Sequence, residues 1–140
     1  MKYQIMPCGE SDVKTIVDGL NAYNARQVPF TQREPYIDMN RKIVDDSGRI
    51  IAGCCAVIYG WHVLYVEILW VDEPFRRQGI GLRLLRAVEE EAREKGAYLV
   101  HLDTFDFQAL GFYQKQGYKL FGTLENVPKG HKRYYLQKQL

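Results

Sequence analysis

One short turn of this sequence carries the residue types of an anion-binding site. It lies in the stretch Val71-Asp72-Glu73-Pro74-Phe75-Arg76-Arg77-Gln78-Gly79-Ile80-Gly81, between an apolar run and an amphipathic helix. The first amides of a helix have no intrahelical acceptor and carry the positive end of its dipole. Glycines let a ligand approach such a backbone closely, and arginines pair well with phosphate. The turn therefore predicts an anion site, unless its glycines only let the helix pack tightly on the strand.

The motif of this turn differs from two common nucleotide-binding loops. It lacks a Gly-Lys-Ser/Thr ending, and Leu84 stands where a dinucleotide fingerprint has its third glycine. The pattern Arg76-x-x-Gly79-x-Gly81, followed by Leu84-Leu85, resembles the pyrophosphate-binding motif of the GNAT superfamily of N-acetyltransferases. The resemblance implies acetyl-CoA as cosubstrate, with Arg76 nearby and the phosphates on the amides of Arg77, Gln78, Gly79, Ile80, Gly81 and Leu82.

The strand before the turn is the second part of the implied cofactor site. In the family, the pantetheine arm lies along this strand, which here ends at Leu69-Trp70-Val71. If two central parallel strands splay apart, these main-chain groups are unpaired and available. The resemblance then makes the amide of Leu69 the candidate donor to the thioester oxygen.

A second motif, Asp106-x-x-Ala109-x-x-Phe112-Tyr113-x-x-x-Gly117-Tyr118, resembles the second acyl-CoA motif of the family. Tyr113 occupies the place of the tyrosine that approaches the thiol sulfur, so the resemblance makes it a cofactor contact and the candidate general acid. Without the family, Tyr113 would be interpreted as a core aromatic residue. Asp106 stands where asparagine is typical, and a carboxylate cannot donate a hydrogen bond as an amide can. Asp106 therefore either contacts the cofactor or caps the helix.

Transfer of an acyl group to an amine also requires a base, because an amine with a pKa of roughly 10 is protonated at neutral pH. Glu67 is the candidate, since it lies in the central strand two residues before Leu69 and hence on the same face of a regular strand. It could instead bind a cationic acceptor, activate a relaying water or fix a neighbouring chain. His101 and Asp103 are rivals on the next strand, while His131 is most simply a solvent-facing loop residue.

The elements that must position these residues follow from periodicity and turn chemistry. Before the central strand, we expect a strand over Lys2–Met6 and a helix capped by Ser11, with an apolar stripe behind it. Asn24–Pro35 is expected to form a short helix or a loop beside the active site. Two strands over Tyr36–Val44 and Arg49–Tyr59 should then form a hairpin. The stripe consists of Val13, Ile16, Val17, Leu20 and Tyr23.

The remainder alternates strands with helices. The central strand, residues 63–70, leads to a helix with Leu82, Leu84, Leu85, Val88 and Ala92 on one face. A strand over Tyr98–Asp103 must lie parallel to the central strand, because a right-handed crossover places it there. A helix over Asp106–Lys115 and strands over Gly117–Thr123 and Lys132–Lys138 complete the chain.

The predicted fold is mixed α/β (α+β) and GNAT-like. It has a mostly antiparallel sheet of six to seven strands, a central parallel strand pair and three to four flanking helices. We expect one N-acetyltransferase domain over residues 1–140. The resemblance covers most of the chain from about Tyr36 onward and is most specific over residues 63–118.

Composition narrows the classes of function. The chain of 140 residues has a formal charge of +2, with 46% hydrophobic and 26% charged residues. This balance indicates no nucleic-acid or membrane partner, and a short turn with Lys129, His131, Lys132 and Arg133 is most simply solvated surface. No apolar run approaches the roughly 20 residues of a membrane span, so we expect a cytoplasmic protein. Cys8, Cys54 and Cys55 lack zinc-ligand spacing, and we expect no metal.

The leading hypothesis is an acetyl-CoA-dependent N-acetyltransferase that acts by direct attack, without a covalent enzyme intermediate. The acceptor would be a primary amine, either a small molecule or a protein amino group, selected by residues 24–35 and 126–132. The alternative is a non-catalytic acyl-CoA-binding or sensor module. The resemblance also makes a homodimer possible, in which Tyr134 and Tyr135 would serve either the interface or the core.

Overall fold

The computed structural model describes residues 2–140 and confirms the predicted fold class. A seven-stranded sheet has the order β1-β3-β4-β5-β7-β6, with β2 also paired to β3. β4 and β5 are parallel, and the other pairs are antiparallel. The elements are α1 (Glu10–Gln27), β1 (Tyr36–Asp38), β2 (Arg41–Val44), β3 (Ile50–Tyr59), β4 (Val63–Val71), the 3-10 turn η1 (Glu73–Phe75), α2 (Ile80–Glu94), β5 (Leu99–Phe105), α3 (Leu110–Lys115), β6 (Lys119–Glu125) and β7 (Lys132–Gln139).

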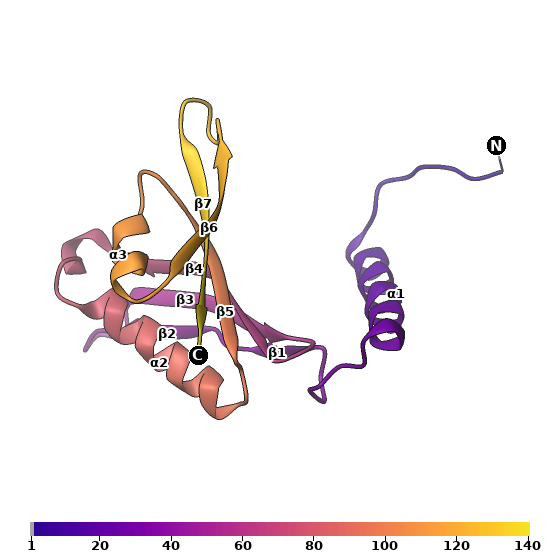
Figure 1. Cartoon of the computed structure of the whole chain (residues 1–140), viewed down its shortest axis with the longest axis horizontal. Helices are drawn as coiled ribbons and strands as arrows, with labels where there is room; N and C mark the ends of the chain where they lie inside the picture. The colour runs from indigo at the N-terminus through magenta and orange to yellow at the C-terminus, as the bar shows by residue number, and fades with distance from the viewer. Residues whose placement is uncertain (1) are drawn as a thin grey trace.

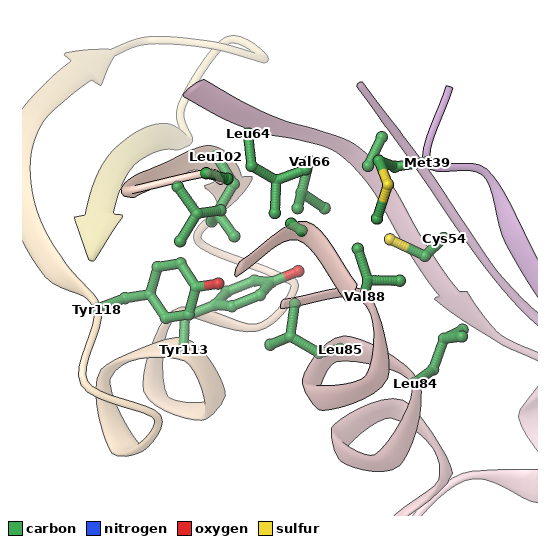
Figure 2. Close-up of a cluster of buried hydrophobic side chains, with 14 of the residues drawn as sticks. Met39, Cys54, Leu64, Val66, Leu84, Leu85, Val88, Leu102, Tyr113 and Tyr118 are labelled. Atoms are coloured by element: carbon green, nitrogen blue, oxygen red, sulfur yellow. The ribbon is translucent and has the colours of Figure 1, made fainter. Parts of the chain in front are cut away.

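The hydrophobic core lies on one face of this sheet. Ile58, Leu64 and Val100 of neighbouring strands are fully buried there. The apolar face of α2 packs against them through Leu85 and Val88, as its sequence pattern predicts. Figure 2 shows Tyr113 and Tyr118 beside these α2 side chains. Both α2 and α3 therefore cover the same face.

The two central strands separate halfway along their length. β4 pairs with β5 only from Val63 to Val66, although its pairing with β3 continues to Val71. A bulge accompanies the separation, because Ala56 pairs with Val66 whereas Cys55 pairs with Ile68. Glu67 is thus an extra residue in the ladder. Beyond Val66, the β5 side of the β4 backbone has no strand partner within residues 2–140.

Helix α1 stands apart from the rest of the molecule. Figure 1 shows it beside the sheet, joined by the linker that leads into β1. The helix has no buried residue, and its predicted apolar stripe is open, with Ile16 and Leu20 each 59% exposed. The prediction that α1 exists is confirmed, but among the described residues no α1 side chain belongs to the hydrophobic core, and α1 meets the sheet through a hydrogen bond from the Tyr36 hydroxyl to Oδ1 of Asn21 at 3.2 Å.

Several predictions for the N-terminal third are wrong. Residues 2–6 form no strand, since a strand needs a hydrogen-bonded neighbour and they have none here. Gly9 rather than Ser11 is the N-cap of α1, and the side chain of Asp12 accepts from the Gly9 amide at 2.9 Å. Residues 28–35 lie against the β3–β4 turn, where the Trp61 indole donates to the Val28 carbonyl at 2.9 Å. That turn is at the end of β4 opposite to Val71.

Two other predicted elements differ in extent. The strand expected over Tyr36–Val44 is divided into β1 and β2, because the Asn40 side chain, in place of a backbone carbonyl, accepts from the Ala56 amide at 2.9 Å. Helix α3 begins at Leu110 rather than at Asp106. Among residues 2–140, no helix is both long and apolar enough to cross a membrane.

Candidate active site

The separation of β4 and β5 opens a cavity of about 1010 Å³ between the sheet, α2 and α3. This volume is at the upper end of typical small-molecule sites, which run from roughly 300 to 1,000 Å³. The cavity brings the phosphate-type turn, the second half of β4 and Tyr113 together. The predicted residues that line it are Glu67, Leu69, Trp70, Val71, Arg76, Arg77, Gly79, Ile80, Gly81, Leu82 and Tyr113.

The N-terminus of α2 opens into this cavity. Gly79 is the N-cap, no side chain caps the helix, and its first turn contains no acidic residue. Gly79 has a φ of 77°, a left-handed conformation that favours glycine, and a Cβ at this position would meet no atom within 4 Å. The first amides of α2 are therefore without a side-chain acceptor, which is the arrangement that an anion requires.

For Gly81, the alternative interpretation, in which the glycine serves helix packing, applies. A Cβ on Gly81 would lie 3.3 Å from Cγ2 of Val71, so this glycine lets α2 pack closely on the end of β4. The two glycines thus differ, since Gly79 faces open space and Gly81 faces the strand. Arg76 braces the same turn, because its Nε donates to the Val71 carbonyl at 2.8 Å.

Tyr113 is buried, with 6% of its surface exposed, and burial raises its pKa to about 12. Its hydroxyl forms no hydrogen bond within residues 2–140. Since no fully buried side-chain oxygen or nitrogen of these residues lacks a partner, the hydroxyl must reach open space. The open space is the cavity that Tyr113 lines. Tyr113 therefore presents a protonated hydroxyl to the cavity at neutral pH.

Glu67 also lines the cavity and is solvent-exposed. The expected alternation that would place it on the face of Leu69 is interrupted by the bulge. Leu69 pairs with Cys54 and packs against the core, whereas Ile68 and Trp70 lie on the opposite face. Bulges often redirect a side chain beside an active site. Glu67 thus reaches the cavity from the bulge and not from a regular strand position.

The two rivals of Glu67 are engaged in other contacts. His101 accepts or donates a hydrogen bond at 2.7 Å between its Nε2 and the Tyr59 hydroxyl, and its ring stacks on Tyr65. Burial lowers the pKa of His101. The carboxylate of Asp103 lines the cavity but accepts from Nε of Arg133 at 2.8 Å. His101 and Asp103 are both less exposed to solvent than Glu67.

Two predicted cofactor residues, Gln78 and Asp106, do not line the cavity. Asp106 accepts from the Lys132 amide at 3.0 Å and contacts Nδ1 of His131 at 2.9 Å, so it fastens the start of β7. It does not cap α3. His131 is exposed, as predicted, and its ring also contacts Asp106.

Sequence reasoning missed Gln108, which lines the cavity. Its Oε1 accepts from the Phe105 amide at 2.8 Å, while its Nε2 has no partner among residues 2–140. Gln108 thus presents an amide donor at the cavity. The spacing of the motif carried no signal for this residue. No group of three or more potential metal-ligating histidine, cysteine or acidic residues occurs in the described part of the chain.

Comparison with known proteins identifies the family of this chain. The model of the acetyltransferase (GNAT) family matches residues 17–118. Blasticidin-S acetyltransferase of Streptomyces morookaense is 34% identical over 116 residues, which cover 82% of this chain and 85% of that protein. A crystal structure of an acetyltransferase from Bacillus cereus is 33% identical and has a TM-score of 0.86, covering 99% of this chain and 98% of that one.

A more distant structure shares the fold. It is described as a streptothricin acetyltransferase of Bacillus anthracis in complex with acetyl coenzyme A, with 22% identity and a TM-score of 0.64 over 79% of this chain and 66% of that one. The family match covers most of the chain and reaches well before Tyr36, where the sequence motifs alone had placed the resemblance. This protein belongs to the GNAT family of acetyltransferases.

Proposed function

We propose that this protein transfers an acetyl group from acetyl-CoA to a primary amine by direct attack of that amine. The observation that carries the proposal is the meeting of three features in one cavity. These are the uncapped N-terminus of α2, the exposed carboxylate of Glu67 and the unpaired hydroxyl of Tyr113.

The cavity fits acetyl-CoA on the chemistry of its donors. Amides of the turn from Arg77 to Leu82 would hold the pyrophosphate, since no side chain of the described residues competes for the start of α2. The β5 side of β4 from Leu69 to Val71, which has no strand partner within residues 2–140 although Arg76 donates to the Val71 carbonyl, would pair with the amide groups of the pantetheine arm. When bound, acetyl-CoA supplies the thioester whose acyl group is transferred.

The residues of this chain have three tasks in that reaction. Glu67 accepts a proton from the ammonium group of the acceptor, either directly or through water, so that the nitrogen lone pair becomes available. The amide of Leu69 donates to the carbonyl oxygen, which becomes negative as the amine attacks. Tyr113 donates the proton that the departing sulfur needs, because its hydroxyl is protonated and has no partner among residues 2–140, and the resulting tyrosinate takes up the second proton that the attacking nitrogen releases.

The acceptor that fits best is a small cationic amine. Glu67 supplies a negative charge at the cavity, and the similar protein from Streptomyces morookaense is named for the acetylation of blasticidin S. The expectation that residues 24–35 select the acceptor is not supported, because none of them lines the cavity. A non-catalytic acyl-CoA-binding module is less favoured, since it would need neither an open carboxylate nor an unpaired tyrosine hydroxyl.

Calorimetric titration with acetyl-CoA, followed by release of free CoA thiol in the presence of an amine panel that includes blasticidin S, tests the proposal. We expect binding with a stoichiometry of one and thiol release that depends on the amine. The Glu67→Gln variant should bind acetyl-CoA as the wild type does but release thiol more slowly. Binding without release for every amine would favour the binding module. No binding by the folded protein would refute both functions.

A further inference from the structure

The sheet has one face that no helix within residues 2–140 covers. We call it the uncovered face and define it by Tyr36, Tyr59, Tyr65, Ile68 and Trp70, which cross-strand register places on one side of β1, β3 and β4. Tyr36, Ile68 and Trp70 are 49%, 50% and 43% exposed, although Ile68 and Trp70 also line the edge of the active-site cavity and the Tyr36 hydroxyl donates to Asn21 of α1. On the opposite side, Ile58 and Leu64 are fully buried beneath α2. An apolar surface of this kind marks an interaction site.

The same chain carries an apolar surface of matching type on α1. Val13, Ile16, Leu20 and Tyr23 are each at least half exposed along one side of the helix. Most helical stability in proteins comes from packing of such a stripe. In its own chain, the apolar stripe of α1 lacks a surface to pack on, and the uncovered face lacks an element that covers it.

A packed linker fixes the direction in which α1 leaves its own sheet. The Gln32 side chain bonds to both sides of the β3–β4 turn, donating to the Ile58 carbonyl at 3.0 Å and accepting from the His62 amide at 2.9 Å. Thr31 contacts the His62 ring at 2.7 Å, and the ring of Phe30 packs edge-on against that of Trp61. The separation of α1 from its sheet is thus built into ordered contacts.

The Bacillus cereus crystal structure supports the same arrangement. It superposes with a TM-score of 0.86 over 99% of this chain. In a TM-score, each residue contributes at most one to an average over the chain. Residues 2–35 are about a quarter of the chain, so they must superpose for the average to reach 0.86. A structure in which this segment folded elsewhere could not reach such a score. The extended N-terminal segment is therefore shared with a solved relative.

The residues before α1 also lack a partner that the sheet can supply. Lys2 to Met6 alternate as an edge strand does, and Tyr3 and Ile5 are 79% and 98% exposed. β1 and β2 pair only with β3, so their outer edge is open within the described sheet. An open edge is a ready template for a strand from another chain.

We propose that the protein is a homodimer in which residues 2–27 are exchanged between two copies. Helix α1 of each copy covers the uncovered face of the other, and Lys2–Met6 extends the open edge of β1 and β2. The exchange buries the apolar stripe of α1 against the uncovered face and gives the open edge of β1 and β2 a strand partner. The contacts of the linker stay unchanged. Exchange of identical elements is a low-cost route to a dimer. This inference does not depend on the proposed function.

Two measurements together test the exchange: the mass of the protein in solution, and crosslinking of a mixture of isotope-labelled and unlabelled protein. Light scattering should give twice the chain mass of 16.3 kDa. Equal amounts of ¹⁴N- and ¹⁵N-labelled protein are then unfolded, refolded together and treated with an amine-reactive crosslinker. Crosslinks from Lys14 of α1 to lysines after residue 35 should contain mixed-isotope and same-isotope pairs in equal shares. A monomer, or a dimer whose α1-to-core crosslinks are all of the same isotope, would overturn the proposal.

A matched pair of variants locates the interface. Ile16→Glu with Leu20→Glu places two charges on the apolar stripe and should yield a monomer with a core that still melts cooperatively. Thr15→Glu with Ala22→Glu adds the same charges to the opposite side of α1, where helical spacing places these residues, and should remain dimeric. Equal dissociation of both variants, or of neither, would contradict the assignment of the stripe to the dimer interface.

Discussion

At the scale of single residues, the two buried tyrosines of the core differ in what their hydroxyl groups contact. Tyr118 donates to the carboxylate of Glu89, which also receives Nζ of Lys138 at 2.9 Å. Tyr113 has no such partner among residues 2–140, although its ring packs edge-on against that of Tyr118. Two aromatic residues of similar burial therefore have different roles, one in stability and one in the cavity.

Replacing each hydroxyl by hydrogen should separate these roles. Tyr113→Phe should lower kcat roughly 100-fold or more, because general-acid catalysis typically contributes that much, and should leave acetyl-CoA affinity unchanged. Tyr118→Phe should instead lower the free energy of unfolding by about 1–3 kcal/mol, since a buried carboxylate loses a donor. Steady-state kinetics and denaturant titration of both variants provide the measurement. Unchanged turnover in Tyr113→Phe would remove it as the acid.

His101 gives a prediction for pH dependence. Burial lowers its pKa below the ordinary value of 6.5, and this effect outweighs the opposing influence of Asp103. The unfolded chain therefore binds a proton on His101 at a higher pH than the folded chain does. The free energy of unfolding should fall as the pH drops below 6.5. In His101→Gln, urea titrations between pH 7 and pH 5 should show a smaller decrease than in the wild type. An identical decrease would assign it to other groups.

At the scale of elements, the turn before α2 combines packing with an open helix terminus. Gly81 is needed for contact with Val71, while Gly79 has a left-handed backbone and free space beyond it. Gly48 offers a matched control in the β2–β3 turn, because its φ is 86° and a Cβ there would also meet nothing within 4 Å. A substitution at either glycine should cause similar backbone strain, but only Gly79 borders the cavity.

We therefore expect Gly79→Asp to weaken acetyl-CoA binding at least tenfold, or about 1.4 kcal/mol, because its carboxylate repels the phosphates at the start of α2. Gly48→Asp should bind acetyl-CoA as the wild type does. Aspartate is chosen because it tolerates positive φ better than most residues. Calorimetry on both variants, with melting temperatures as a check of folding, provides the measurement. Equal affinity in the two variants would argue against the anion site.

At the scale of the whole molecule, the position of α1 ties stability to association. If residues 2–27 are exchanged between copies, native protein is stabilised by its partner through mass action. The melting temperature should then rise with protein concentration, and the Ile16→Glu with Leu20→Glu variant should lose that dependence. Calorimetric scans over a hundredfold range of concentration measure the effect. A concentration-independent melting temperature in the wild type would count against the exchange.

The sequence by itself determined the elements whose patterns are local. The period of α2, the apolar run of β3 and the turn chemistry of Gly79 and Gly96 place these elements correctly, and the two motifs identified the family. Glu67, Leu69 and Tyr113, which the sequence assigned to one site, line one cavity, and their roles there stay predictions. Each of these signals depends on spacing within one segment, which a sequence contains in full.

Only the tertiary structure decided the features that depend on partners distant in sequence. The bulge at Glu67 arises from register between β3 and β4, and the contacts of Asp106 come from β7. The amphipathic pattern of α1 predicts a helix with an apolar partner but cannot say which surface that is. The prediction of a strand over Lys2–Met6 was wrong for the same reason, because strand pairing depends on two segments and not on one.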